Sequence, residues 1–211
     1  MNLEKIKIYR ITHISNIPHI LRFGITHKNS PNANKSYTSI GDVKLIGTRE
    51  NKIVPINNKE FLKLGDFIPF YFWIKMPMLY VMQHGGNHVG KVVPPEDIIY
   101  ISCKLSEIIK LKNKFYFSDG HAIDAFTLFY DRYKIKELPT IIDWNSVMEL
   151  HWSGEDKLAL KRKKQAEFLI FPEIPPECLN SFGCYNEKIK LKLISMGIDE
   201  NKIFANHDFY F

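Results

Sequence analysis

The chain has 211 residues, of which 45% are hydrophobic and 25% are charged, and its net charge is +6. This composition is typical of a globular protein with its own core, and we expect residues 1–211 to form a single domain. No apolar run approaches the roughly 20 residues that span a bilayer, which argues against a membrane helix, and the positive charge favours anionic partners such as nucleic acids or phosphates.

The N-terminal quarter of the chain predicts a strand, a short helix and a long polar segment. Residues 6–11 alternate apolar and polar side chains, as a half-buried strand does. A short helix is expected through about Phe23, because Ser15 or Asn16 can cap its start, Pro18 suits its first turn and Gly24 can end it. Residues 26–58 are rich in Asn, Ser, Lys and Gly, and their weak periodicity indicates a functional or mobile segment.

The rest of the chain mixes strands and helices without a regular βαβ rhythm. Strands are expected at residues 67–72, 97–102, 115–117, 164–171, 182–185 and 202–205. Helices are expected at residues 77–83, 105–111, 122–133, 144–152 and 187–195. This order predicts an α+β domain built around a mixed or antiparallel sheet.

Glu167 is a carboxylate inside a segment that otherwise has the pattern of a buried strand. Gln165, Glu167 and Leu169 project from one face of that strand. The basic run at residues 161–164 comes just before it, and a carboxylate beside positive charge suits an anionic substrate and a cationic transition state. The alternative is an edge-strand glutamate that faces water, as most charged residues do.

Two polar clusters in the first fifty residues could hold a ligand. Residues 9–16 run from a strand into a helix, where free backbone N–H groups and Thr12, His13 and Asn16 can bind an amide, a ribose or a phosphate. Helix capping together with ordinary surface polarity explains the same residues equally well. Arg49 follows a glycine-containing segment that we expect to be flexible, and its guanidinium suits bidentate phosphate binding, although most loop arginines are only solvated.

Two later clusters have both a structural and a functional interpretation. Residues 66–72 and 76–80 form a dense block of aromatic and methionine side chains. Most of this block must be core, with one or two rings left to stack on a base or on nicotinamide. His121 lies at a strand-to-helix junction where it can face a cleft, although capping by Ser118 or Asp119 explains this segment nearly as well.

The sequence has no metal motif and no common nucleotide motif. The eight histidines lack metal-ligand spacing, the three cysteines form no CxxC pair, and GxGxxG and Walker loops do not occur. We therefore expect no bound metal, and we expect that any bound nucleotide is held by a structural element other than these loops. The odd number of cysteines and the lack of a signal peptide favour the reducing cytoplasm.

Taken together, the clusters resemble the DarT family of DNA ADP-ribosyltransferase toxins over nearly the whole chain. Each motif is weak alone, but they occur in the family's order, at residues 9–14, 16–18, 49, 66–72, 77–80, 118–122 and 165–169. The resemblance implies an ADP-ribosyltransferase fold, with a split mixed β-core, flanking helices and a cleft for NAD. It also implies a toxin that transfers ADP-ribose from NAD onto a base of single-stranded DNA and releases nicotinamide. Its expected partner is a macrodomain antitoxin that removes the modification.

The resemblance also implies roles for particular residues. Glu167 would be the catalytic glutamate, Arg49 the arginine beside NAD, and His121 an assisting group near the reacting base. The cofactor contacts that it implies are Arg10, Thr12, His13, Asn16, Gly24, Arg49 and Tyr71. Some family members carry histidine where this chain has Arg10. That position differs between relatives that modify thymine and guanine, so both bases stay open, with the arginine favouring guanine.

A mechanism follows as a hypothesis from these roles. Cleavage of the nicotinamide–ribose bond builds positive charge on the ribose, and a fixed carboxylate stabilises that charge. Glu167 would bind a ribose hydroxyl or take the proton from the attacking base nitrogen, and the sequence does not separate the two. Arg49 would hold the pyrophosphate and so fix the reacting carbon against its nucleophile.

The basic loop before Glu167 and residues 26–48 are expected to form the DNA groove. The side chains expected to contact DNA are Lys161, Arg162, Lys163, Lys164 and Trp152. A solvated helix end and a core tryptophan are the structural alternatives. Two other functions use the same features: the same transferase chemistry on RNA or protein, and a non-catalytic module that binds single-stranded nucleic acid.

Overall fold

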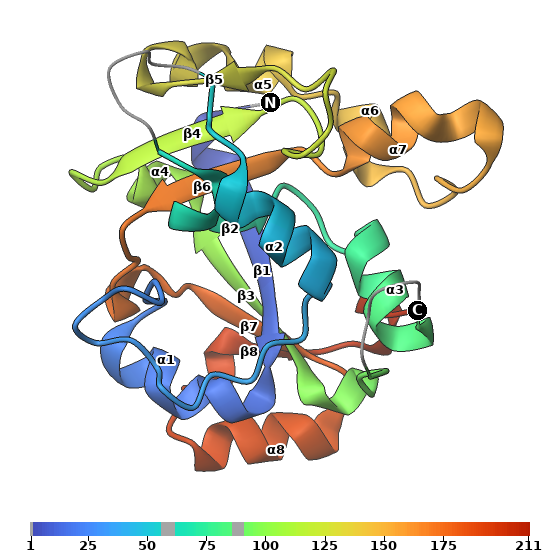
Figure 1. Ribbon diagram of the computed structural model, residues 1–211. Coiled ribbons are helices and arrows are strands. Elements are labelled where there is room, and N and C mark those ends of the chain that lie inside the picture. The colour runs from blue at the N-terminus through green and yellow to red at the C-terminus, as the bar shows by residue number, and fades with distance from the viewer. Residues whose placement is uncertain (1, 56–61, 86–90) are drawn as a thin grey trace.

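A single sheet of eight strands organises this computed structural model, which describes residues 2–55, 62–85 and 91–211 (Figure 1). The strands lie in the order β5-β4-β6-β2-β1-β3-β7-β8, and every neighbouring pair is antiparallel except β7 and β8. Their bounds are β1 Lys7–His13, β2 Ile68–Tyr71, β3 Ile98–Lys104, β4 Lys114–Ser118, β5 Phe129–Tyr130, β6 Glu167–Phe171, β7 Ser181–Cys184 and β8 Ile203–Ala205. The predicted mixed sheet is therefore confirmed.

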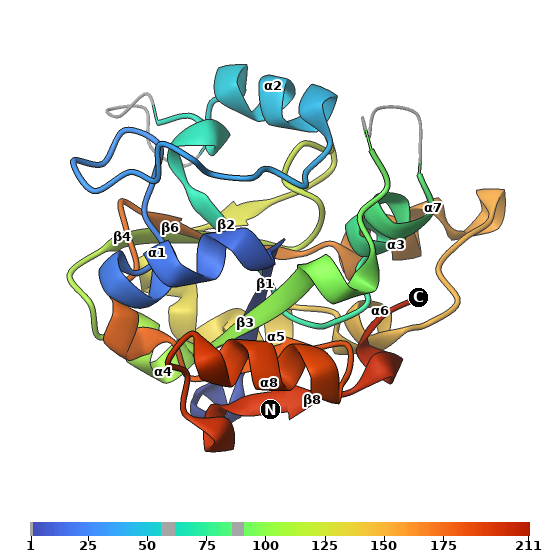
Figure 2. The ribbon, with the colours of Figure 1, turned by 90° about the horizontal axis from the view of Figure 1, so that it is seen from below.

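Short helices flank the sheet. Their bounds are α1 Ile17–Phe23, α2 Val43–Asn51, α3 Pro77–His84, α4 Leu105–Ile108, α5 Leu138–Ile141, α6 Trp144–Met148, α7 Leu158–Lys164 and α8 Glu187–Ser195. Helix α8 lies along β7 and β8, while α2 stands on the opposite side of the molecule (Figure 2). Within the described ranges, none of these helices combines the length and apolar character needed to cross a membrane.

The sheet is split between β1 and β2. Strand β1 pairs with β3 along its whole length, but it pairs with β2 only at Tyr9 and Tyr71. On the other side of β2, Tyr71 stands opposite Glu167 of β6. The weak β1–β2 pairing lets the two strands diverge, and side chains from both strands line a cavity at this point.

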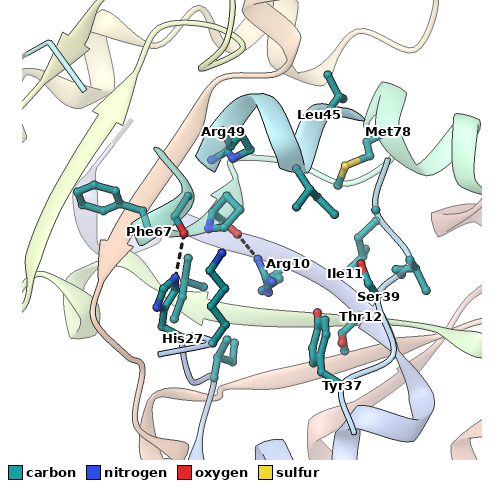
Figure 3. A pocket seen from close by; sticks show the side chains of 18 of the residues that line it. Arg10, Ile11, Thr12, His27, Tyr37, Ser39, Leu45, Arg49, Phe67 and Met78 are labelled. Carbon is teal, nitrogen blue, oxygen red and sulfur yellow. Dashed lines mark hydrogen bonds between the residues drawn. The ribbon is translucent and has the colours of Figure 1, made fainter. Parts of the chain in front are cut away.

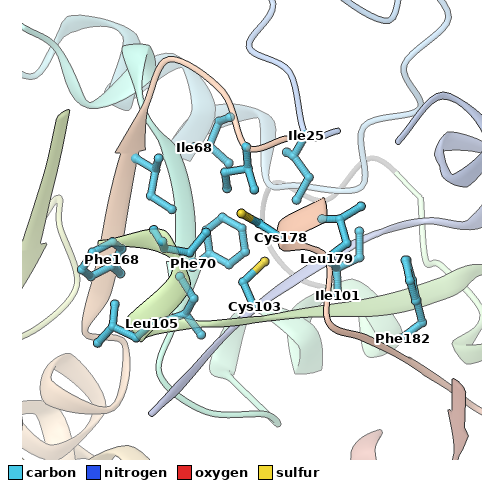
Figure 4. Close-up of a cluster of buried hydrophobic side chains, with 14 of the residues drawn as sticks. Ile25, Ile68, Phe70, Ile101, Cys103, Leu105, Phe168, Cys178, Leu179 and Phe182 are labelled. Carbon is cyan, nitrogen blue, oxygen red and sulfur yellow. The ribbon is translucent and has the colours of Figure 1, made fainter. Parts of the chain in front are cut away.

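The main hydrophobic core joins the two halves of the sheet. Phe70 of β2, Ile101 of β3 and Phe168 of β6 are each fully buried in it (Figure 4). Burying a side chain of this size contributes about 1.5–3 kcal/mol, so the core holds the strands together despite the split. The thiols of Cys103 and Cys178 lie in the same core, and neither forms a disulfide.

All seven predicted strands are confirmed, and so are the first helix and the helices predicted at residues 77–83 and 187–195. Helix α1 begins at Ile17, has Pro18 in its first turn and ends at Gly24, whose φ is +77°. The predicted helices that begin at residues 105 and 144 are shorter than expected, and end at Ile108 and Met148.

The helix predicted for residues 122–133 is wrong. This segment contains turns, the short strand β5 and the start of a 3-10 helix, Arg132–Glu137. Its apolar side chains do not share one buried face: Phe126 is 83% and Tyr133 92% exposed, whereas Ala122 is fully buried. Asp124 instead accepts a hydrogen bond from the backbone N–H of Phe126, a local bond that competes with helix formation.

The polar segment at residues 26–58 also differs from expectation. It contains helix α2, which the weak periodicity did not reveal, and its last three residues lie outside the described ranges. The side chain of Asp42 accepts a hydrogen bond from Leu45 N at 3.0 Å and so caps the start of α2.

Candidate active site

Glu167 and Arg49 form a buried ion pair. Glu167 is the first residue of β6, an interior strand, and its side chain is fully buried, so the water-facing alternative is wrong. Arg49 comes from the last turn of α2, and its Nη1 lies 2.9 Å from Oε2 and 3.1 Å from Oε1 of Glu167. The backbone N–H of Ala122 donates to Oε1 at 3.0 Å. Opposite charge and an amide donor therefore offset the cost of burying this carboxylate.

Two buried polar atoms of this pair have hydrogen-bonding capacity to spare. Among the described residues, Arg49 Nη2 and Glu167 Oε2 have no hydrogen-bond partner, although Oε2 stays in ionic contact with Arg49 Nη1. Buried polar atoms are nearly always satisfied, so such orphans need an explanation. A ligand with hydroxyl and anionic oxygen groups would satisfy both.

A cavity of about 380 Å³ opens beside the ion pair (Figure 3). Its wall combines Arg10 and Thr12 of β1, Tyr37 from the segment before α2, Arg49, and Met78 of α3. Arg10 Nη1 donates to the carbonyl of Pro69 at 2.9 Å, which bridges the split between β1 and β2. Mostly apolar walls with a few convergent polar groups are typical of small-molecule sites.

Burial changes the acid–base properties of two side chains at this site. His121 also lines the cavity, and burial lowers the pKa of its imidazole below the usual 6.5, while the nearby Glu167 carboxylate partly opposes that shift. The imidazole is therefore neutral at neutral pH. Burial raises the pKa of Tyr71, so its phenol stays protonated, and its hydroxyl donates to Met78 Sδ at 3.6 Å.

Comparison with known proteins identifies the family. Residues 9–211 match the family model described as "ssDNA thymidine ADP-ribosyltransferase, DarT". The chain belongs to the DarT family. The predicted resemblance is confirmed, and with it the α+β ADP-ribosyltransferase fold and an enzymatic activity on single-stranded DNA.

Three relatives show how far the similarity to DarT proteins extends. A DNA ADP-ribosyl transferase of Escherichia coli O127:H6 is 31% identical over 208 residues, which cover 98% of this chain and 93% of the relative. The structure of Thermus sp. 2.9 DarT in complex with ADP-ribosylated ssDNA superposes with a TM-score of 0.84, at 25% identity over 99% of this chain and 97% of that one.

The same Thermus protein in complex with NAD+ gives a TM-score of 0.79, at 25% identity over 99% of this chain and 98% of that one. A Thermosipho africanus relative is named a DNA ADP-ribosyl transferase-DNA ADP-ribosyl glycohydrolase fusion protein. It is 28% identical over 82% of this chain and 40% of its own length.

Not all of the cofactor residues implied by the DarT resemblance reach the cavity. Arg10, Thr12, Arg49 and Tyr71 line it, whereas His13, Asn16 and Gly24 do not. Contact between NAD and these last three residues stays a prediction.

Each of these three positions has a structural role. His13 contacts Ser15 through Nδ1. Asn16 donates to the carbonyl of Thr38 at 2.9 Å and accepts from its N–H at 2.9 Å, so it holds the segment that leads to the cavity wall. Gly24 packs so closely on the carbonyl oxygen of Ile174 that a Cβ would lie 2.0 Å from it.

The basic run before Glu167 is mostly committed to internal contacts in this DarT chain. Lys164 was expected to bind DNA, but it is fully buried and donates to the carbonyl of Val147 at 3.0 Å, so that prediction is wrong for this residue. Arg162 lies 3.1 Å from Asp119 Oδ1 and Lys163 lies 3.0 Å from Asp143 Oδ2.

The remaining two predicted DNA contacts lie together. Lys161 is exposed, with its Nζ 5.4 Å from the ring centroid of Trp152, which is 8% exposed. Lys161 is thus the member of the basic run that is best placed for a phosphate, and Trp152 is nearly buried, as in the core alternative.

The main feature that the sequence did not reveal is the ordered helix, α2, on which Arg49 lies. Arg49 does not follow a flexible segment but lies on α2, which packs against Gly65. A Cβ on Gly65 would lie 2.9 Å from Glu50 Cα, so a glycine is needed for this approach. The Asp42 cap was the one local signal that could have indicated α2.

Proposed function

We propose that this chain transfers ADP-ribose from NAD to a thymine base of single-stranded DNA and releases nicotinamide. The observation that carries the proposal is the buried Glu167–Arg49 pair, in which Arg49 lines the cavity, Glu167 lies behind it, and each partner has an unsatisfied polar atom. The complexes of Thermus DarT with NAD+ and with ADP-ribosylated ssDNA support it. The family description names thymidine, which favours thymine over the guanine that Arg10 suggested.

Glu167 is the catalytic residue in this proposal. As the nicotinamide–ribose bond breaks, its carboxylate stabilises the positive charge that develops on the ribose. A ring nitrogen of the thymine forms the new glycosidic bond, and the proton of that nitrogen passes to Glu167. The orphaned Oε2 is the oxygen that is free to accept it or to bind a ribose hydroxyl.

The other site residues bind and orient the substrates. Arg49 holds the Glu167 carboxylate with Nη1 and keeps Nη2 for an oxygen of NAD. Arg10, Thr12 and Tyr71 form the rest of the NAD-binding wall. His121, held neutral by burial, contacts the acceptor base.

The acceptor is single-stranded because a base in a duplex must first leave the stack, at a cost of a few kcal/mol. Lys161 lies just before Glu167, is exposed and provides a phosphate contact. Residues 1–211 act as one catalytic domain, since strands from both ends of the chain form the same sheet.

The biological role in this proposal is that of a toxin controlled by an antitoxin. The Thermosipho africanus relative carries a DNA ADP-ribosyl glycohydrolase in the same polypeptide, which supports a macrodomain partner that reverses the modification. The reaction takes place in the cytoplasm, where NAD and single-stranded DNA are both present and where three unpaired thiols would stay reduced.

The test is to incubate the chain with NAD and oligonucleotides and to measure product mass. A thymine-containing single strand should gain one ADP-ribose, whereas strands lacking thymine, duplexes, RNA and protein acceptors should gain none. Glu167→Gln, which keeps the shape of the side chain, should abolish the gain. Transfer at the wild-type rate by Glu167→Gln would disprove the role of Glu167. Modification of a strand that contains guanine but no thymine would disprove the assignment of thymine as the acceptor base.

A further inference from the structure

The turn that follows β4, residues 118–122, is bonded to Arg162 on one side. Arg162 Nη1 donates to Asp119 Oδ1 at 3.1 Å and lies 3.3 Å from Thr127 Oγ1. The backbone carbonyl of Arg162 accepts from the N–H of His121 at 2.9 Å. Both ends of this arginine, its guanidinium and its main chain, therefore hold the same turn.

Gly120 shows how tightly the two segments pack. A Cβ on Gly120 would lie 2.5 Å from Arg162 Nη1 and 3.0 Å from Arg162 Cγ. The aliphatic stem and the guanidinium thus lie directly on the glycine backbone. Thr127 closes the contact, because its hydroxyl donates to the carbonyl of His121 at 2.8 Å.

On its other side the same turn holds Glu167. The N–H of Ala122 donates to Glu167 Oε1 at 3.0 Å, and the N–H of Glu167 donates to the hydroxyl of Ser118 at 3.1 Å. The Ser118 hydroxyl in turn donates to the carbonyl of Gly120 at 2.7 Å. Any displacement of this turn therefore moves a donor of the catalytic carboxylate.

We propose that Arg162 is a positioning residue that clamps the 118–122 turn and thereby fixes the Glu167 carboxylate. The inference rests on the proposed transferase function. It replaces the expected role of Arg162 in binding DNA, because its side chain is only 15% exposed and its charge is paired with Asp119. Positioning matters because a displacement of about 1 Å at a reacting group can lower a rate by about 100-fold.

The kinetics of two matched variants distinguish a positioning role of Arg162 from a role in contacting DNA. Arg162→Met removes one positive charge and keeps an unbranched stem, and Lys161→Met makes the same change on the adjacent exposed residue. We expect Arg162→Met to lower kcat by about 10- to 100-fold with the KM for the oligonucleotide within twofold of wild type. We expect Lys161→Met to raise that KM instead. Arg162→Lys, which keeps the charge and the stem, should recover part of the lost kcat.

Gly120→Ala tests the same clamp without changing any charge. The added methyl must displace the Arg162 guanidinium, so kcat should fall as it does in Arg162→Met. A raised KM with wild-type kcat in both Arg162→Met and Gly120→Ala would overturn the proposal.

Hydrogen exchange of the Ala122 amide gives a readout that does not need activity. Its N–H, protected by Glu167, should exchange faster in Arg162→Lys than in the wild type, while amides of β1 keep their protection. Unchanged exchange at Ala122 would overturn the clamp. If the wild-type chain modified no DNA, the transferase proposal would fail, and this exchange measurement would still decide whether Arg162 holds the turn.

Discussion

Among the single residues, Glu167 and Arg49 form an ion pair that stabilises the buried carboxylate and leaves polar atoms for substrate. A fully buried carboxylate needs a positively charged partner. Here that partner is Arg49, which lies on a helix distant in the sequence. The pair also keeps one atom on each side unsatisfied. Such a site is held in shape before substrate arrives, which is what charge stabilisation in a transition state requires.

Removing Arg49 should therefore destabilise the fold as well as the reaction. We expect Arg49→Ala to lower the free energy of unfolding by about 3 kcal/mol, because it leaves a buried carboxylate without its counter-charge. The double variant Arg49→Ala/Glu167→Gln should regain most of this loss. Urea denaturation at pH 7 without NAD measures both, and a loss below about 1 kcal/mol for Arg49→Ala would contradict the pairing.

His121 carries a prediction about pH. Burial lowers its pKa below 6.5, so between that lowered value and 6.5 the unfolded chain binds a proton that the folded chain does not. The free energy of unfolding should consequently fall as the pH falls through this window, and His121→Gln should remove that part of the fall. An NMR titration of the His121 ring should give a pKa below 6.5, and a value at or above 6.5 would refute the burial argument.

Lys164 is buried, so its ammonium group gains and loses its proton inside the protein and not in a DNA groove. Burial lowers its pKa from 10.5 to about 8, so from pH 8 to 10.5 the unfolded chain keeps a proton that the folded chain has lost. The stability of the wild type relative to Lys164→Met should rise by about 2 kcal/mol between pH 7.5 and 10. Chemical denaturation at the two pH values measures this, and a flat difference would show that Lys164 is solvated.

At the scale of elements, α2 delivers Arg49 and its packing decides where Arg49 stands. The helix contacts the 3-10 turn Leu64–Asp66, and Gly65 lies against the backbone of Arg49 and Glu50. The segment that looked like a polar loop is thus an ordered part of the site. The close backbone contact at Gly65 orders this segment, although no residue of α2 is fully buried.

A methyl at Gly65 should push α2 out of place. We expect Gly65→Ala to lower kcat/KM by about 10- to 100-fold, because the Cβ would lie 2.9 Å from Glu50 Cα and move Arg49 with it. Gly47→Ala is the matched control on the same helix, where a Cβ meets nothing within 4 Å. It should keep wild-type kinetics and stabilise the helix by up to about 1 kcal/mol. Equal kinetics in the two variants would contradict the role of this contact.

At the scale of the whole molecule, the net charge of +6 overstates the charge available to DNA. Arg162 and Lys163 are paired with carboxylates and Lys164 is buried, so the run before Glu167 offers mainly Lys161. Electrostatic binding depends on the phosphates actually neutralised rather than on the total charge.

The dependence of DNA binding on salt should reflect the number of basic side chains that are free to neutralise phosphates. We expect the logarithm of the affinity for a single strand to fall linearly with the logarithm of the salt concentration, and Lys161→Met to reduce the slope by about 0.7. Arg162→Met should not change the slope, since its guanidinium is already paired. Fluorescence anisotropy at several salt concentrations measures the slopes, and an equal reduction in the two variants would contradict the assignment.

Sequence patterns alone predicted seven of the eight strands, the first helix and the candidate glutamate, but they missed β5, which lies in the segment predicted to be a helix. Apolar alternation and runs predict strands because burial on a sheet face depends on the order of neighbouring side chains. Gly24 marks the end of α1 for an equally local reason, whereas the side chain of Asn16 bonds to Thr38 and does not cap the helix. The motif order also sufficed to indicate the DarT family, since it needs no knowledge of contacts.

Contacts between segments that are distant in the sequence determine which charges pair. Arg49 reaches Glu167 because α2 packs against Gly65, and Lys164 is buried because its chain turns toward Val147. The wrong helix at residues 122–133 has the same origin: Ala122 and Phe129 pack against a core cluster in a non-helical conformation, and Phe126 is left exposed. Local patterns record what a segment can form, whereas partners distant in the sequence determine which of those possibilities is stable.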